Sequence, residues 1–462
     1  MKAEQLQRLH EAGMQVLQRT GVVFRDVETV QLLASHGLTV DGCRVFIPPE
    51  TIADALSTVP SSFVVEARQP SRDLVIGTGA LVSSSAAGAV RIAEEGLTRP
   101  LTGADLKRWI RLCHMAPNLN LLGNLLVLSG STMCQGLLRS VYDSVTLTDK
   151  VYQFPLFEPE HVRVSLDVLE ILYGEDWASH PRILAIVNSV SPLLFTSHAC
   201  ATIRLMASLN QPLGVTPAAL GGMTGPVTVA GLVVQQHAEV LAGLVLAQLI
   251  RPGCPYLYGG FSSSISMSTG GFALGSPEFW GVAAATVELA GYLGIPVRAG
   301  SGGTDSHLLD MQAGIETAMG LSLVIARGVD LVLHGGGALS ALNAVSLEKL
   351  LIDDQLLGML RRRPWDPSVD EECMAVTVID RVGPGGSFLA HKHTRAHYRE
   401  TDSSPLFNRR SHAAWYAAGA RSSSEVAVAE VDAMLEAYSP PGIDTVVDRQ
   451  LKRYCLGGTT RT

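Results

Sequence analysis

A histidine closes an apolar run and is followed at once by three glycines. In the segment LVLHGGGAL, residues 331–339, His334 stands directly before Gly335, Gly336 and Gly337. Glycine has no Cβ, so another backbone or a ligand can approach such a segment closely. His334 is therefore either a core residue that hydrogen-bonds to backbone, or part of a site that a ligand approaches.

Glycine is also frequent where other apolar runs end. The ends read ALGGMTGP at 219–226, YGGFSSS at 258–264 and GSGGTDSH at 300–307, which includes Gly302 and Gly303. We expect Gly302, Gly303, Gly335 and Gly336 to floor an open basin, with turn geometry alone as the alternative. Backbone N–H groups of the last two loops would also suit a phosphate. Neither loop contains a Lys or Arg to balance phosphate charge, which disfavours that interpretation.

Aromatic side chains make up only 6% of the chain, so their spacing is informative. Tyr256 and Tyr258 are two residues apart with Phe261 just beyond, and Tyr152 and Phe154 repeat this spacing. Residues two apart on a strand share one face. If these faces point into the basin, its π walls would suit a quaternary ammonium group, which is held by dispersion and cation–π attraction. If they face surrounding helices, the same residues are ordinary core.

Further polar candidates for substrate binding lie near the same ends: Glu239, Arg298, Asp305, His307 and Asp310. Four of them have a plain structural alternative. Asp305 precedes a predicted helix and has the character of an N-cap, and Glu239 lies one helical turn after Gln235, with which it can pair. Arg298 would equally form an outward salt bridge, and His307 would equally be a surface residue.

Three histidines, His391, His393 and His397, raise the question of a metal site. His393 and His397 are four residues apart and would share one helical face. However, no Glu, Asp or Cys ligand is spaced as in a zinc motif, and Lys392 and Arg395 add like charge. We therefore expect no metal.

The chain alternates between short apolar runs and longer helical runs from about residue 118. Seven such β/α alternations are visible, and GALVSSSAAGAVRI at 79–92 supplies a plausible eighth strand. No G-x-G-x-x-G follows the first strand, which argues against a doubly wound dinucleotide fold. The pattern predicts an α/β protein of the TIM (β/α)₈ barrel type, with its active site at the carboxyl ends of the strands.

Helical segments flank the predicted barrel on both sides. Residues 1–75 form an N-terminal helical region, residues 76–364 the barrel catalytic domain, and residues 365–462 a C-terminal helical extension. Glycine and proline mark the ends of the predicted N-terminal helices.

Composition excludes several classes of protein. A net charge of −8 without an extended basic run argues against a nucleic-acid partner. Seven cysteines without a C-x-x-C pair predict no disulfide framework and a reducing cytoplasm. The most apolar run is interrupted by Gln235, Gln236, His237 and Glu239, so we expect no membrane span. With 47% hydrophobic residues, the chain is predicted to form a homo-oligomer.

Three long segments resemble the trimethylamine methyltransferase family: the sequence from GGMTGPVTVAGLVVQQHAEVL to PYLYGG, that from GSPEFWGVAAATVELAGYLG to QAGIE, and SLEKLLIDDQLL. The resemblance extends from VLQRTGVVF to FLAHKHTRAHYRE and so covers nearly the whole chain. It implies a TIM barrel that passes a methyl group from a methylated amine to the cobalt of a separate corrinoid protein, with no cofactor bound permanently by the chain itself.

Family members that act on trimethylamine carry pyrrolysine in the barrel, whereas every residue here is an ordinary amino acid. The resemblance therefore implies the non-pyrrolysine branch and a quaternary amine, glycine betaine above all, with related betaines and carnitine as alternatives. In that setting His334 is expected to donate a hydrogen bond to a betaine carboxylate, with Arg298 as a second candidate. Two other functions remain open: a barrel enzyme for a phosphorylated small molecule, and a non-catalytic betaine-binding protein.

Overall fold

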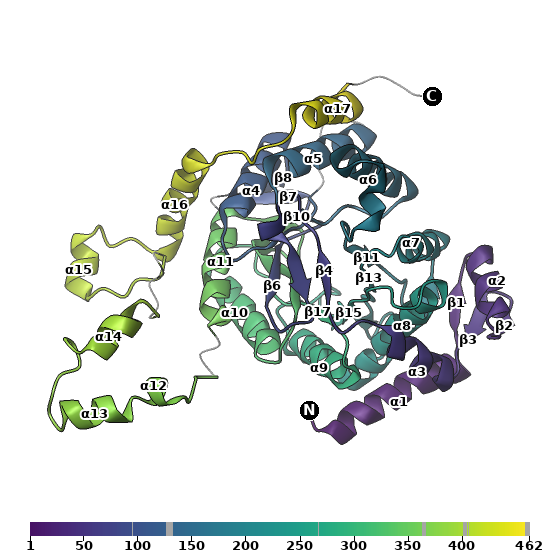
Figure 1. The fold of residues 1–462 in the computed structure, drawn as a ribbon, viewed down its shortest axis with the longest axis horizontal. Helices are drawn as coiled ribbons and strands as arrows, with labels where there is room; N and C mark the ends of the chain where they lie inside the picture. The colour runs from purple at the N-terminus through teal and green to yellow at the C-terminus, as the bar shows by residue number, and fades with distance from the viewer. Residues whose placement is uncertain are drawn as a thin grey trace.

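The computed structural model describes residues 1–94, 96–125, 133–266, 268–362, 366–400, 404 and 406–457. Eight parallel strands occupy its centre and the helices α4 to α11 surround them (Figure 1). The central strands are β6 (Val82–Ser85), β9 (Leu121–Leu122), β10 (Val151–Tyr152), β11 (Ala185–Val187), β13 (Leu213–Val215), β15 (Tyr258–Gly260), β17 (Val297–Gly300) and β18 (Leu331–Gly336). The helices that follow them are α4 (Gly103–Met115), α5 (Met133–Leu147), α6 (Pro159–Tyr173), α7 (Ser197–Ser208), α8 (Val229–Ile250), α9 (Pro277–Leu293), α10 (Met311–Ile325) and α11 (Leu347–Arg361).

The central strands follow one another around a ring in chain order. One parallel sheet has the order β10, β9, β6, β18, β17, β15, so the first and last central strands are neighbours. A bridge between Leu213 and Tyr256 continues it to β13, which pairs with β11. Within the described ranges no ladder joins β10 to β11. The predicted α/β class is confirmed, and each predicted β/α unit appears where the sequence placed it.

Local sequence explains where these helices begin. Six of them start after a Ser, Thr or Asp whose side chain accepts a backbone N–H of the first turn: Thr102, Thr196, Thr228, Ser276, Asp310 and Ser346. Such caps satisfy donors that have no partner within the helix. Helix α8 is long and apolar enough to cross a membrane by length and composition, but most of it is buried inside the fold.

A short hairpin fills one end of the strand ring. Strands β4 (Phe63–Val65) and β5 (Leu74–Ile76), joined through a 3₁₀ turn at Pro70–Arg72, pair antiparallel. Phe63, Val65 and Ile76 pack in one apolar cluster with inward residues of the central strands. This cluster shows which strand positions face the interior: Val82, Leu121, Val151, Leu184, Leu257, Leu331 and Leu333. The hairpin therefore closes the amino-terminal end of the ring.

The rest of the N-terminal region packs outside the ring. Helices α1 (Ala3–Arg19) and α3 (Pro49–Thr58) contact α8, as Figure 1 also shows. Helix α2 (Val27–Ser35) lies against a small sheet that the sequence did not reveal. Its strands are β1 (Val22–Phe24), β2 (Thr39–Asp41), β3 (Arg44–Phe46) and β12 (Leu194–Phe195).

Extensions of the strand ends build a second small sheet beside the ring. Its order is β19 (Ala338–Leu339), β20 (Ala344–Val345), β7 (Arg91–Glu94) and β8 (Leu97–Pro100). Strands β14 (Leu220–Gly221) and β16 (Ser263–Ser264) pair across two further loops. Residues Glu175–Ser179 form a 3₁₀ turn before β11.

The C-terminal part of the chain contains several helices. Helix α16 (Ser423–Ala437) packs on α11 and α4, and α17 (Thr445–Cys455) packs on α5 and α6. Between α11 and α16, α12 (Glu371–Met374), α13 (Val376–Val382), α14 (Lys392–His397), a 3₁₀ turn at Tyr398–Glu400 and α15 (His412–Ala417) project away from the ring (Figure 1). We call the described residues 366–400, 404 and 406–420 the C-terminal arm.

Candidate functional site

Arg298 points into the strand ring. In the parallel ladders it pairs with Gly259 on one side and Leu331 on the other, and Leu331 belongs to the interior cluster. Its side chain crosses β15: a Cβ on Gly259 would lie 2.5 Å from its Cγ. Beyond Gly259 its Nη2 donates to Thr216 Oγ1 at 2.5 Å. The absence of a side chain at Gly259 is what lets the guanidinium lie against the inner wall.

The guanidinium of Arg298 is a buried cation that has no acidic partner in the part of the chain that the structure describes. The side chain is 2% exposed, and none of the ion pairs formed by described residues includes it. Removal from water lowers its pKa from 12.5 to about 9. Since a buried charge is costly unless it is paired, this arrangement favours an anion beside Arg298.

His334 faces the same interior because of an unusual backbone. The ladder places Val332 on the outer face and Leu333 on the inner face, so regular alternation would turn His334 outward. Instead His334 has φ = +56°, and the register of β18 against β6 shifts between Val332 and Gly336. A left-handed conformation is unfavourable for a residue with a Cβ, and such strain is concentrated at functional sites.

The His334 imidazole is neutral and has one free donor. Ala87 N–H donates to its Nδ1 at 3.2 Å, so the ring hydrogen is on Nε2. Burial, and then the charge of Arg298, lower the pKa of His334 from 6.5 to about 3. Its Nε2–H has no hydrogen-bond acceptor within the described part of the chain, and the side chain is partly exposed. His334 can therefore donate to a ligand over a broad pH range.

Phe261 completes this group. It follows Leu257 and Gly259 on the inward face of β15, and its ring meets His334 edge-on with centroids 5.4 Å apart. Phe272 and Phe279 pack against it at 5.7 and 5.2 Å. A Cβ on Gly300 would lie 2.3 Å from the Phe261 ring, so this glycine admits the aromatic side chain. We call Thr216, Phe261, Arg298 and His334 the Arg298 cluster.

The expectation that Tyr256 and Tyr258 wall the basin is wrong. Both alternate with the interior residue Leu257 and so face the helices. Tyr256 Oη donates to the Val240 carbonyl of α8 at 2.9 Å, and Tyr258 Oη lies 2.8 Å from His237 Nδ1 on the same helix. Burial raises the pKa of both hydroxyl groups. They fasten β15 to α8 instead of lining the interior.

Tyr152 and Phe154 also belong to the core. Tyr152 alternates with the interior residue Val151, and its ring lies 4.8 Å from that of Phe154. Both are buried in the main hydrophobic cluster and border a small cavity that also touches Tyr173 and Arg182. Of the predicted aromatic residues, Phe261 alone joins Arg298 and His334.

Glu239 is a buried structural carboxylate. Its Oε2 accepts from Ser189 Oγ at 2.5 Å and Ser191 Oγ at 3.0 Å, and its Oε1 accepts from Leu193 N–H at 3.0 Å. The predicted pairing with Gln235 is present at 3.1 Å. Glu239 thus ties the segment after β11 to α8, and its acceptors are used within the protein.

The carboxylates after β17 organise loops. Asp305 accepts from Leu274 N–H and Gly275 N–H, both at 2.9 Å, and burial raises its pKa. The N-cap of α10 is Asp310, which accepts from Ala313 N–H, so the N-cap interpretation of Asp305 is wrong. His307 is exposed and lies 2.8 Å from Ser340 Oγ.

The glycines expected to floor an open basin contact protein. A Cβ on Gly302 would lie 2.3 Å from the His334 carbonyl oxygen, and one on Gly335 would lie 3.1 Å from the Ser84 carbonyl oxygen. A Cβ on Gly303 would contact Leu274, and a Cβ on Gly336 would contact Leu119. These glycines permit close approach of neighbouring elements, and a ligand-accessible floor stays a prediction.

The histidines considered for a metal lie on the C-terminal arm. His391 caps α14 by accepting from His393 N–H, and His397 Nδ1 lies 2.8 Å from Glu400 Oε1. The rings of His393 and His397 are 4.5 Å apart. In the described residues no group of three His, Cys, Asp or Glu could hold a metal ion.

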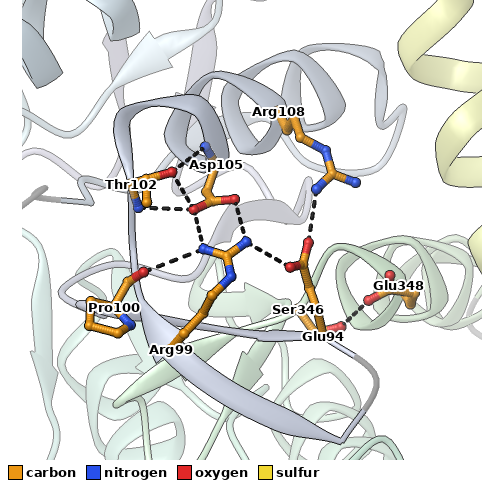
Figure 2. A network of polar contacts seen from close by, with 8 residues as sticks. All are labelled: Glu94, Arg99, Pro100, Thr102, Asp105, Arg108, Ser346 and Glu348. Carbon is orange, nitrogen blue, oxygen red and sulfur yellow. Dashed lines mark hydrogen bonds and ion pairs between the residues drawn. The ribbon is translucent and has the colours of Figure 1, made fainter.

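Charged residues anchor the small sheet beside the His334 end of the ring. Arg99 on β8 binds both oxygens of Asp105, at 2.6 and 2.9 Å, and also Glu94, which in turn accepts from Arg108 (Figure 2). Arg99 lowers the pKa of Asp105 to about 2. The hairpin of β7 and β8 is thereby fixed to the start of α4.

Three residues of this interior region, one member of the Arg298 cluster and two glycines beside it, were not predicted. Thr216 has no distinctive sequence signal, because it becomes relevant only when Arg298 crosses β15. Gly259 and Gly300 do carry a signal, since glycine in the interior of a strand often marks close approach of another group.

Comparison with known proteins identifies the family. The trimethylamine methyltransferase (MTTB) family model matches residues 1–457. A glycine betaine methyltransferase of Desulfitobacterium hafniense (strain Y51) is 32% identical over 462 residues, covering 98% of this chain and 95% of the relative. The trimethylamine methyltransferase MttB of Methanosarcina thermophila is 30% identical over 461 residues, covering 97% and 95%.

Structural similarity extends to a further methylamine enzyme. The crystal structure of the Methanosarcina barkeri monomethylamine methyltransferase (MtmB) matches with a TM-score of 0.51 at 12% identity, covering 95% of this chain and 88% of that one. At this identity the match supports the fold alone. The family match over nearly the whole sequence, with relatives named as methyltransferases, shows that the chain belongs to the trimethylamine methyltransferase family and is a methyltransferase.

Proposed function

We propose that this methyltransferase moves a methyl group from a quaternary amine, with glycine betaine as the best-fitting substrate, to Co(I) of a separate corrinoid protein. We further propose that the strand ring is a (β/α)₈ barrel spanning residues 76–364, with the Arg298 cluster at its active site. The observation that carries the proposal is Arg298, a buried cation that has no acidic partner among the described residues and lies beside an imidazole whose Nε2–H has no acceptor among them.

The cluster suits the two ends of a betaine. A carboxylate placed between Arg298 and His334 Nε2 would satisfy both donors, and charge-assisted bonds of this kind are the stronger ones in proteins. The cationic end would then lie towards Phe261, whose ring offers the face that attracts an onium group. A trimethylamine molecule has no carboxylate and would leave Arg298 unpaired.

The chemistry also agrees with the protonation states of the site. Removal of a methyl group from a quaternary nitrogen releases a neutral tertiary amine, so no proton has to be delivered to it. The proposed site accordingly has no general acid, since the pKa of His334 is about 3 and Arg298 acts as a fixed charge. The corrinoid partner supplies the methyl-accepting nucleophile, and this chain's residues bind the amine, exclude water and orient one methyl group.

Isothermal calorimetry with three ligands tests this assignment. Glycine betaine is expected to bind, whereas choline lacks the carboxylate and inorganic phosphate lacks the cation, so both should bind at least tenfold more weakly. Tighter binding of phosphate than of glycine betaine would instead support an enzyme for a phosphorylated substrate.

Reconstitution separates catalysis from simple binding. The purified protein is expected to be colourless and to form dimethylglycine from glycine betaine only when a cognate corrinoid protein is added. Normal binding without product in the presence of an active, reduced corrinoid partner would indicate a betaine-binding protein. Turnover without the partner would contradict the two-protein scheme.

A further inference from the structure

A buried ion pair lies between α11 and the end of β18. Lys349 Nζ donates to Asp353 Oδ2 at 2.6 Å, and the two side chains are 1% and 4% exposed. Desolvation offsets much of the attraction within a buried pair, and uncharged residues of similar volume are often at least as stable in its place. Stability alone therefore gives no sufficient reason for two charges at this point of the core.

The carboxylate of this pair holds the backbone just after His334. Asp353 Oδ2 accepts the Gly337 N–H at 2.8 Å, and the Gly337 carbonyl accepts the Ser346 N–H at 3.0 Å. Gly337 has φ = +86°, and a Cβ there would lie 2.4 Å from the Trp109 ring, so the chain turns sharply against α4. Asp353 thereby fixes the far end of the segment that begins at His334.

The ammonium group of the pair connects to a second segment beside His334. Lys349 Nζ also donates to Thr317 Oγ1 of α10 at 2.9 Å, and Thr317 Oγ1 donates to the Gly302 carbonyl at 3.3 Å. A Cβ on Gly302 would lie 2.3 Å from the His334 carbonyl oxygen, so the loop after β17 packs directly on the His334 peptide. The ion pair is thus linked to the backbone that follows β17 as well as to the backbone that follows β18.

His334 requires such support because of its own backbone. Its φ of +56° is unfavourable for a residue with a Cβ, and a conformation of this kind persists only where the surroundings enforce it. The register of β18 against β6 shifts between Val332 and Gly336. If the end of this segment were released, regular alternation would turn the imidazole away from Arg298.

We propose that Asp353 is a positioning residue, which holds the His334 imidazole at the proposed substrate site through the backbone of Gly337, and that Lys349 is the counter-charge of its buried carboxylate. An ionised carboxylate is a stronger acceptor for a backbone N–H than a neutral group. The pair has no net charge, so it fixes the backbone without adding charge to the ring. The proposal rests on the proposed function for the identity of the ligand, but the position of His334 can be measured without ligand.

Two double variants separate positioning from stability. Lys349→Met with Asp353→Asn removes both charges but keeps an amide oxygen that can accept the Gly337 N–H, whereas Lys349→Met with Asp353→Val removes the acceptor as well. In calorimetry the valine variant should bind glycine betaine at least about tenfold more weakly, because the hydrogen bond from His334 is lost. The asparagine variant should stay within about threefold of the wild type. If the valine variant fails to fold, Asp353→Ala with Lys349→Met takes its place, because alanine cannot overpack the site.

The His334 ring reports its own position in the ligand-free protein. Burial and the charge of Arg298 lower its pKa to about 3, so its NMR resonances, identified by their loss in His334→Asn, should not shift between about pH 7.5 and 5.5 in the wild type. The ring should titrate within this range in the valine variant and should not do so in the asparagine variant.

A purely structural ion pair would give a different result. A valine variant that is less stable, but keeps the wild-type titration of His334 and the wild-type Kd, would overturn the proposal. Failure of the wild type to bind glycine betaine would instead contradict the proposed substrate, and the titration of His334 would still decide whether Asp353 positions the ring.

Discussion

Replacement of Arg298 by Met separates the two effects that a buried, unpaired cation should have. Methionine keeps much of the volume and removes the charge. Burial lowers the pKa of Arg298 from 12.5 to about 9, so the ligand-free protein holds this charge at a cost on the order of a few kcal/mol. Loss of the Thr216 hydrogen bond costs only about 1 kcal/mol. We expect the ligand-free variant to be as stable as the wild type or more stable.

Binding should change in the opposite direction. Two charge-assisted hydrogen bonds to a carboxylate contribute roughly 3 kcal/mol or more, so the Kd for glycine betaine should rise at least about a hundredfold. In the wild type, ligand at one hundred times its Kd stabilises the fold by about 2.7 kcal/mol. For a chain of 462 residues this corresponds to an increase in Tm of about 3 °C. At the same concentration the variant should show an increase of only about 0.4 °C or less.

Differential scanning calorimetry with and without glycine betaine measures both quantities in one series. Arg251→Met, at a surface arginine whose Nη1 binds the Ser208 carbonyl, is the matched control and should retain the ligand-induced increase. An Arg298→Met variant that is clearly less stable without ligand, yet gains the full 3 °C with it, would refute the assignment of Arg298 to the substrate carboxylate.

Three further predictions concern the same region. His334→Gly should be about 1 kcal/mol more stable than His334→Ala by urea unfolding, because glycine adopts φ = +56° without strain; equal stabilities would contradict a strained backbone. The pKa of His334 is about 3 in the folded protein and 6.5 when unfolded, so stability falls as the pH drops below 6.5, by at most about 2 kcal/mol at pH 5. His334→Asn should lose less stability than the wild type between pH 7 and 5, and parallel losses would show that another group titrates. Tyr258→Phe should cost about 1–2 kcal/mol, because His237 Nδ1 loses its partner, without changing the Kd for glycine betaine; a weaker Kd in calorimetry would return the Tyr258 hydroxyl to the site.

The alternation of strands and helices was predictable because buried parallel strands are short, continuous apolar runs. Runs such as PYLYGGFS and VDLVLHGG stand out from the helical segments around them, and their order implies the ring. The β4–β5 hairpin was missed because its three-residue strands are too short to show a pattern. Its role depends on contacts with residues of six strands that are distant in the sequence.

Which face of a strand points into the ring was less predictable than which residues share a face. The spacing of Tyr256 and Tyr258 correctly gives them one shared face, but the choice of face depends on Leu257, which packs inside the ring. His334 shows the converse case. Regular alternation turns it outward, and only the left-handed backbone at that residue brings its imidazole beside Arg298.

Closure of the amino-terminal end of the ring by β4 and β5 limits the routes by which small molecules can enter and leave the ring. Phe63, Val65 and Ile76 pack against the inward side chains of the central strands at this end, so in the proposed reaction the methyl donor, its demethylated product and the methyl acceptor would all use the carboxyl end of the ring. In the proposed reaction the small molecule therefore enters first, the acceptor protein covers it, and the spent amine departs last. The hairpin at the amino-terminal end of the ring would impose this kinetic order, whichever residues carry out the chemistry.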